Sequence, residues 1–192
     1  MVTIQSYAEV IPEACTGCKL CVYVCPTSAI EMSENLAIIE ESKCVSCPNC
    51  IGICGEDAIF KKSRETPLVL GVDYSTVDQE KITEICRNSN IHPMQWLCLC
   101  TATRAREGAA AIILGAKTPE DMALMTGIRS GCTVYCAMMS LRLLKGAGIG
   151  FVQQPKWRLY DTTQSLWDIP EDVVKTYEGY FLEEDKDVFR KF

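Results

Sequence analysis

The order of apolar and polar residues divides the chain into a first part with short strands and a longer part that is mainly helical. Short apolar runs predict strands at residues 30–32, 37–39 and 59–61. The polar residues 61–67 then interrupt the pattern. Because they show neither a strand nor a helix period, they predict a linker.

Beyond this linker, caps and apolar faces predict four helices. Asp78 is a suitable N-cap for the first, in which Ile82, Ile85 and Cys86 share one face. The other three are expected at residues 104–114, 118–127 and about 132–145. The third of the four opens with a hydroxyl cap, a proline and two acids, and a glycine ends it. From Phe151 onward we expect an irregular, aromatic and acidic arm.

The composition adds thirteen cysteines to this picture and disfavours several classes of protein. An odd number argues against a closed disulfide framework, and the first residues lack the basic and apolar regions of a secretory signal. The apolar run at residues 109–114 is far shorter than the roughly 20 residues that span a bilayer. A cytoplasmic protein with reduced thiols is therefore expected. The formal charge of −6, without a basic run, disfavours nucleic acid and acidic lipid as partners.

Eight of the cysteines form an internal repeat. The first copy comprises Cys15, Cys18, Cys21, Cys25, Ala29 and Ile30, and the second, at one constant offset, comprises Cys44, Cys47, Cys50, Cys54, Ala58 and Ile59. Such a repeat predicts two halves related by a pseudo-twofold axis. Three thiolates two residues apart on a tight loop can reach three corners of one cubane, whereas the fourth points the other way. Zinc is the alternative for paired cysteines, but two such fused runs suit it poorly.

The two runs resemble those of the two-cluster bacterial ferredoxins, over about residues 8–62. The resemblance implies two [4Fe-4S] clusters with crossed ligation, one held by Cys15, Cys18, Cys21 and Cys54 and the other by Cys44, Cys47, Cys50 and Cys25. Two residues depart from the family pattern. Gly55 stands where the proline of Cys25-Pro26 is usually repeated, and Pro48 lies inside the second loop. Neither removes a ligand, but both change the backbone N–H donors that could reach sulfur.

A second constellation has the spacing Cys98-x-Cys100 and Cys132-x3-Cys136, with two predicted helices between the pairs. Together with residues 114–120 and 126–132, it resembles the [2Fe-2S] module of bacterioferritin-associated ferredoxin, over about residues 96–146. The resemblance implies that these four cysteines hold a [2Fe-2S] cluster. The second pair departs from the usual Cys-x2-Cys, so a [4Fe-4S] cluster remains an alternative, as do zinc and reduced core thiols. Cys132 and Cys136 are expected one turn apart at a helix start, which would favour both thiolates.

Two further residues and the arm complete the candidates. Cys86 is expected to be an inert core thiol, and His92 to pack or cap near the third site, with a ligand role as the alternative. Nine of the fifteen aromatic residues lie in the last 42 positions. Such a mixture of aromatics and acids suits either subunit docking or folding back over the chain's own modules.

The expected fold class is therefore α+β, with four segments. Residues 1–62 form a dicluster ferredoxin domain, 63–78 a linker, 79–150 a helical, helix-turn-helix [2Fe-2S]-type domain, and 151–192 the arm. No phosphate loop and no nucleophile with a base is recognisable, so we expect no catalytic site in the chain itself.

The expected function is to relay single electrons as a subunit of a larger oxidoreductase. The resemblance favours a flavin dehydrogenase as the partner, with a tungsten or molybdenum (metallopterin) enzyme second. A diffusible ferredoxin or a nicotinamide-linked donor would exchange electrons through that complex. The alternatives are a redox or iron sensor and a freely diffusing ferredoxin.

Overall fold

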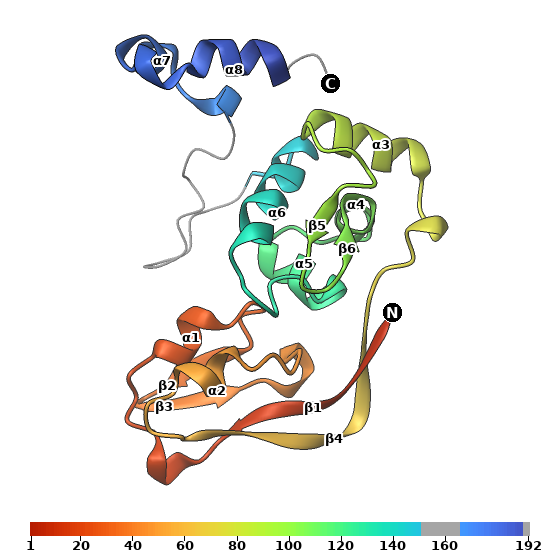
Figure 1. Ribbon diagram of the computed structural model, residues 1–192. Helices are drawn as coiled ribbons and strands as arrows, with labels where there is room; N and C mark the ends of the chain where they lie inside the picture. The colour runs from red at the N-terminus through yellow and green to blue at the C-terminus, as the bar shows by residue number, and fades with distance from the viewer. Residues whose placement is uncertain (151–165, 190–192) are drawn as a thin grey trace. The chain divides into compact units, whose positions relative to one another are not determined.

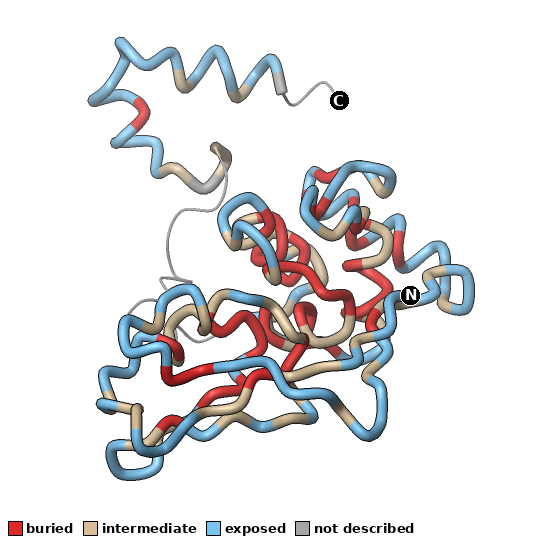
Figure 2. The backbone as a smooth tube through the Cα atoms, turned by 60° about the horizontal axis from the view of Figure 1, so that its bottom comes forward, coloured by how far each residue is buried: buried red, intermediate tan, exposed pale blue. Residues whose placement is uncertain are grey.

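The computed structural model describes residues 1–150 and 166–189. The chain divides into two compact units, Met1–Phe151 and Val152–Phe192. Figure 2 shows buried backbone in both parts of the first unit, whereas the described residues of the second are mostly exposed. Both units contain helices, and the first also contains strands, so the fold is α+β as predicted.

The first part of the first unit repeats one short arrangement twice. Its elements are β1 (Val2–Val10), η1 (Pro12–Ala14), α1 (Leu20–Val24), β2 (Ile30–Ser33), β3 (Leu36–Ile39), η2 (Glu41–Lys43), α2 (Asn49–Ile53) and β4 (Ile59–Leu70). In each copy a 3-10 turn leads into a cysteine loop, a five-residue helix and then a strand. Helices α1 and α2 contact each other, β2 pairs with β3, and β1 pairs with β4. The strands predicted at 30–32, 37–39 and 59–61 are all present.

The prediction of a linker at residues 61–67 is wrong, as is the start of the proposed 63–78 linker. These residues belong to β4, which pairs antiparallel with β1 as far as Val2 opposite Leu70 (Figure 1). The segment is polar because β4 is exposed along most of its length. Pro67 falls where the register shifts, between the pairs Ile4–Leu68 and Ser6–Ser63, so its missing N–H removes no regular ladder bond.

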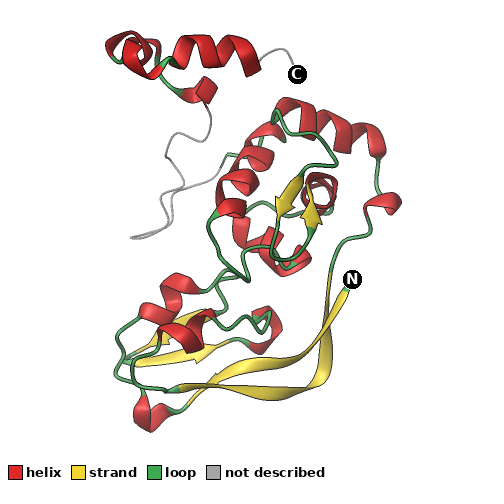
Figure 3. Ribbon diagram, viewed as in Figure 1, coloured by secondary structure: helices red, strands yellow, loops and turns green. Residues whose placement is uncertain are grey.

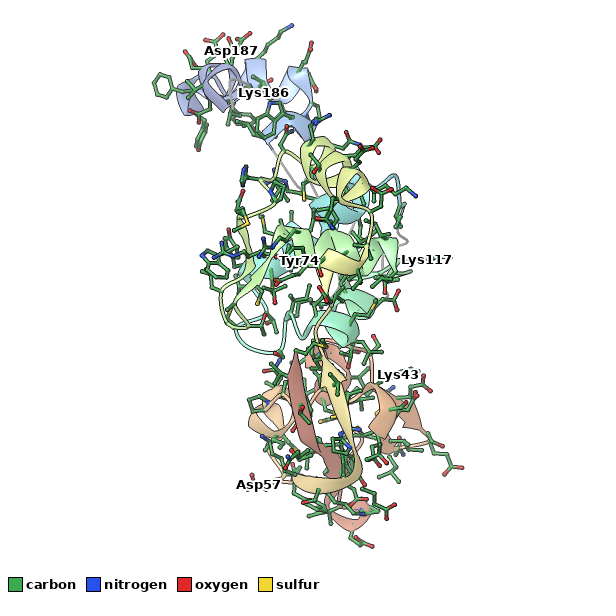
Figure 4. All side chains as sticks on the ribbon, turned by 90° about the vertical axis from the view of Figure 1, so that its right-hand side faces the viewer. Lys43, Asp57, Tyr74, Lys117, Lys186 and Asp187 are labelled. Atoms are coloured by element: carbon green, nitrogen blue, oxygen red, sulfur yellow. The ribbon has the colours of Figure 1, made fainter. Side chains whose placement is uncertain are left out.

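The second part of the first unit is built around three packed helices. Its elements are η3 (Tyr74–Thr76), α3 (Gln79–Asn88), β5 (Trp96–Cys98), β6 (Thr103–Arg104), α4 (Ala105–Ile113), α5 (Pro119–Thr126) and α6 (Tyr135–Gly146). Helices α3, α4 and α6 contact one another around a core that includes Leu97, Met122 and Leu143. The hairpin of β5 and β6 (Figure 3) was not predicted. Tyr74, labelled in Figure 4, anchors η3 because the Arg106 guanidinium stacks 3.8 Å from its ring centroid.

The predicted helix caps are confirmed, but the last helix of this part begins later than expected. The Asp78 carboxylate accepts the N–H groups of the first turn of α3, and Thr118 forms a capping box at the start of α5. Gly127 ends α5 in the left-handed conformation, with a φ of 77°. Helix α6 begins at Tyr135 because Thr133 is left-handed, with a φ of 57°, and cannot be part of a right-handed helix. Cys132 therefore precedes the helix instead of opening it.

The second unit is helical where it is described, so the prediction of an irregular arm is wrong for residues 166–189. It contains η4 (Leu166–Asp168), α7 (Glu171–Thr176), η5 (Glu178–Tyr180) and α8 (Leu182–Phe189). Residues 151–165 of the predicted arm lie outside the described part. Within the described ranges, no helix combines the length and the apolar character that crossing a bilayer requires.

Candidate metal centres

Four thiols from both copies of the repeat line one cavity, which we call site 1. They belong to Cys15, Cys18, Cys21 and Cys54. The first three come from the loop before α1 and its first turn, and the fourth follows α2. The cavity holds about 380 Å³ of space, part of it open to solvent, and its remaining walls are mainly apolar, with Met32, Ala37 and Ile59 among them.

A second cavity, site 2, is lined by the other four thiols of the repeat. These belong to Cys25, Cys44, Cys47 and Cys50. The cavity comprises about 290 Å³ of space, part of it open to solvent, and is otherwise walled by Thr27 and apolar residues such as Ala8 and Ile30. In each copy, three thiols line one cavity and the fourth lines the other. This crossed grouping is the one that the ferredoxin resemblance implies.

The loop of site 1 passes close to the backbone of Asn35 and depends on a glycine to do so. Gly17 has a φ of 70°, and a Cβ there would lie 2.6 Å from the carbonyl oxygen of Asn35. A residue with a side chain would therefore force the loop off its path. Cys18 is exposed and Cys15 and Cys54 are half-buried, so site 1 opens towards solvent.

Site 2 is the more enclosed of the two, and backbone N–H groups point at its sulfurs. The N–H of Ala29 donates to Sγ of Cys25 over 3.2 Å, and that of Ala8 donates to Sγ of Cys44 over 3.4 Å. Burial raises the pKa of Cys47 to about 11 and that of Cys50 to about 12. Thiolates in such surroundings need positive charge beside them, which bound iron would supply.

Sequence reasoning missed Arg64, which stabilises site 2 from the strand that was read as a linker. Its side chain is only 3% exposed and lies 3.7 Å from a carboxylate oxygen of Glu41. The guanidinium donates to the carbonyl oxygens of Cys44 and Ser6. It thereby connects β4 to a thiol-bearing residue of site 2. An arginine in a polar run carries no sequence signal of this role.

The remaining four thiols meet at a third place, site 3. They belong to Cys98 at the end of β5, Cys100 in the turn before β6, Cys132 in the loop before α6, and Cys136 in the first turn of α6. The Cys98 and Cys136 thiols interact as one pair, and the Cys100 and Cys132 thiols as another. The N–H of Cys132 also donates to Sγ of Cys100 over 3.5 Å.

Cys132 and Cys136 differ in their electrostatic surroundings. The N–H groups of Val134 and Tyr135 lower the pKa of Cys132, as expected for a thiolate beside a helix start. The hydrogen bond with Cys136 lowers the pKa of Cys98 to about 4, and the same bond, together with burial, raises the pKa of Cys136. At Cys132 the direction agrees with the prediction that the helix start favours the thiolate, whereas at Cys136 the neighbouring Cys98 and burial dominate the shift of the pKa.

The loop before Cys132 approaches site 3 closely. A Cβ on Gly131 would lie 2.7 Å from Cβ and 2.8 Å from Sγ of Cys100. Only a glycine allows this approach without displacing the thiol. The residues of site 3 thus fit a compact thiolate-bound group, as those of sites 1 and 2 do.

Nowhere in the described ranges do three or more His, Cys, Asp or Glu side chains gather closely enough to hold a single metal ion. A zinc ion needs its four ligands around one point, at about 2.3 Å for sulfur. The thiols of sites 1 and 2 instead surround cavities, as ligands of a multi-iron cluster must.

Cys86 and His92 take the structural roles considered for them. Cys86 is fully buried among α3, α4 and α6, and burial raises its pKa to about 11. His92 is exposed, and its Nδ1 accepts the N–H of Met94 over 3.2 Å, which caps the turn before β5.

Comparisons with known proteins place the first part of the chain in a family. The model of the 4Fe-4S binding domain matches residues 8–31. Ferredoxin-2 of Chlorobaculum tepidum is 37% identical over 60 residues, which are 28% of this chain and 97% of that protein. One subunit of an ion-translocating oxidoreductase complex from Methanosarcina acetivorans is 47% identical over 45 residues, which are 23% of this chain and 17% of that one.

A third relative is a subunit of an NADH-quinone oxidoreductase from Pelobacter propionicus. It is 33% identical over 72 residues, which are 31% of this chain and 38% of the relative. This chain therefore covers nearly all of the small ferredoxin but only a minor part of the two complex subunits. No solved structure matches the chain significantly.

Proposed function

Since the chain belongs to the 4Fe-4S ferredoxins and is an iron–sulfur electron-transfer protein, we propose that it serves as the electron-transfer subunit of a larger oxidoreductase. In this proposal, sites 1 and 2 each hold a [4Fe-4S] cluster. Site 3 holds a third cluster, [2Fe-2S] by resemblance or else [4Fe-4S]. Such clusters, held by four cysteines, supply one-electron transfer and have no open position for substrate.

The observation that carries the proposal is the crossed grouping of thiols around two cavities. Site 1 takes Cys54 from the second copy of the repeat, and site 2 takes Cys25 from the first. The N–H groups of Ala8 and Ala29 stabilise negative charge on the sulfurs of site 2.

The exposure of individual thiols supports an entry and an exit for electrons. Cys18 of site 1 and both Cys100 and Cys132 of site 3 are exposed, whereas three of the four thiols of site 2 are buried. Sites 1 and 3 can therefore face redox partners, while site 2 is shielded. We also propose a cytoplasmic location, where thiols stay reduced and available to bind iron.

The partner that we propose carries a flavin or, as the second choice, a metallopterin. Two of the relatives are subunits of oxidoreductase complexes by name, which supports membership of such a complex. The second unit suits docking, since Tyr180 and Phe181 are 72% and 63% exposed. Large exposed aromatic side chains are typical of interface anchors. Acids at the start of α8 would select the partner by charge.

The test is to purify the chain anaerobically from its native cells, in full length and truncated after Gly150. The full-length chain should copurify with a flavin or metallopterin protein. The truncated chain should lose that protein but keep its iron. Tyr180→Ser removes an exposed aromatic side chain, whereas the control variant Asp187→Ser removes a solvent-facing acid of α8 (Figure 4). Only Tyr180→Ser should weaken the complex. Copurification that survives truncation would exclude docking through the arm.

A further inference from the structure

Arg129 occupies an unusual position in the loop between α5 and α6. It is buried, with only 9% of its surface exposed, and its φ of 67° places it in the left-handed region. A residue with a long side chain avoids this conformation unless the surrounding structure imposes it, and such outliers gather at functional sites. Its neighbours help to hold it there, since the Ser130 hydroxyl donates to the carbonyl oxygen of Gly127 over 2.7 Å.

The left-handed backbone turns the N–H of Arg129 towards site 3. This N–H lies close enough to the sulfurs of Cys98 and Cys136 to stabilise negative charge on both. Two residues further on, Gly131 makes the close approach to Cys100. The same short loop therefore touches three of the four thiols of site 3, and the conformation of Arg129 determines where that contact lies.

The side chain of Arg129 reaches in the other direction, to site 2. Its Nη1 donates to the carbonyl oxygen of Pro26 over 3.3 Å. Pro26 is fully buried and directly follows Cys25, one of the four thiol-bearing residues of site 2. Gly55 is the equivalent residue of the second repeat, and open space surrounds the place where its Cβ would lie. The two copies of the repeat thus differ in this contact.

The charge of Arg129 is compensated by a second buried residue. Nη1 lies 2.9 Å from Oε1 of Glu120 in α5, and both side chains are only 10% exposed. Burying an ion pair costs desolvation that mutual attraction repays only in part, so such a pair is weak evidence for stability. The ion pair instead fixes the position of the guanidinium. Glu120 holds it beside Pro26, while the backbone N–H of Arg129 stays beside the sulfurs of site 3.

We infer that Arg129 couples sites 2 and 3 into one electron path, which would make the order along the chain site 1, site 2, site 3. This inference rests on the proposed clusters. One electron leaves the cluster bound at one site and reduces the cluster bound at the other by one electron, and no bond forms or breaks. Arg129 is a positioning residue: it fixes the distance between the two sites and keeps a positive charge between them.

The test uses the full-length, anaerobically purified protein and a variant that keeps the backbone of residue 129. Arg129→Gly retains the left-handed conformation and the N–H to the sulfurs but removes the guanidinium. Because Arg129→Gly alone would remove the cation that faces the buried Glu120 carboxylate, the double variant Arg129→Gly, Glu120→Gln is the main probe. Arg142→Gln is the matched control, since Arg142 donates to carbonyl oxygens of residues 89 and 90 and its loss also removes one positive charge.

Iron and sulfide are counted first, and then less than one electron per protein is added from dithionite in a stopped-flow instrument. Redistribution between the sites is followed by freeze-quench EPR. The double variant should keep its iron but redistribute electrons roughly 10-fold more slowly or worse, as loss of an outer-shell partner does. The control should match the wild type. Wild-type redistribution in a fully loaded double variant would overturn the inference. Iron sufficient for only two cubanes in the wild type would instead overturn the proposed third cluster.

Discussion

The backbone N–H of Ala8 donates a hydrogen bond to Sγ of Cys44 over 3.4 Å, although the two residues are 36 positions apart. Ala8 belongs to β1, and the strand paired with it, β4, supplies Arg64 to the carbonyl oxygen of Cys44. The β1–β4 ribbon therefore contributes polar groups to site 2 from outside the cysteine loops. Groups in this position tune the electronic properties of a bound cluster.

Removing the charge of Arg64 should change the potential at site 2. A nearby positive charge favours the reduced, more negative state, so Arg64→Gln should lower the midpoint potential, by on the order of 50 mV. EPR-monitored redox titration measures this directly. Lys61→Gln removes a charge from an exposed residue of the same strand and should leave the potential unchanged. Equal shifts in the two variants would exclude a specific role for Arg64.

Crossed ligation makes a prediction about pairs of variants. Cys18 and Cys54 line site 1, whereas Cys47 lines site 2. Cys54→Ala and Cys18→Ala should therefore impair the same cluster, so that their combination loses no more iron than the worse single variant. Cys54→Ala combined with Cys47→Ala should impair both clusters. Non-additivity of this kind identifies residues that act as one unit. If Cys54→Ala and Cys47→Ala proved non-additive instead, ligation within each copy would be the correct arrangement.

Gly131 offers a steric test of site 3. Gly131→Ala would bring a Cβ to 2.7 Å from Cβ of Cys100, so Cys100 must move. We expect the affinity for the third cluster to fall roughly 10- to 100-fold, with the two cubanes retained. The matched control is Gly55→Ala, where the added methyl meets nothing within 4 Å. Iron analysis and visible spectra separate the outcomes, and full iron content in both variants would contradict the close approach.

Cys86 should behave as a neutral core thiol. Burial raises its pKa to about 11, so at pH 8 it keeps its proton in the folded protein and is a poor nucleophile. Iodoacetamide should leave it unmodified at that pH and label it only when the protein unfolds or the pH approaches 11. The unfolded chain releases this proton at a lower pH than the folded protein does. The contribution of the thiol to the free energy of unfolding therefore declines as the pH rises from the pKa of Cys86 in the unfolded chain to its pKa in the folded protein. Peptide mass spectrometry provides the readout, and rapid labelling of the folded protein at pH 8 would show that the thiol is accessible.

The features that the sequence predicted correctly depend on local chemistry. Cysteine spacing determines which thiols share a loop, and the capping side chains of Asp78 and Thr118 lie within three residues of the groups that they bind. Strand pairing between β1 and β4 joins residues far apart in the sequence, and residues 61–67 of β4 show no apolar alternation that would reveal a strand. A polar strand therefore resembled a linker.

The part of the site that sequence reasoning missed depends on backbone conformation. The left-handed φ of Thr133 delays the start of α6. The left-handed φ of Arg129 belongs to the buried cation that we place between sites 2 and 3. Neither residue type favours that conformation, so only tertiary contacts could specify it.

The central claim is that three groups of thiols bind iron and sulfide. Iron and acid-labile sulfide should be quantified together in the full-length protein, purified without oxygen. Two [4Fe-4S] clusters and one [2Fe-2S] cluster predict about ten of each per chain, and a third [4Fe-4S] cluster predicts about twelve. A colourless preparation without acid-labile sulfide would contradict the account.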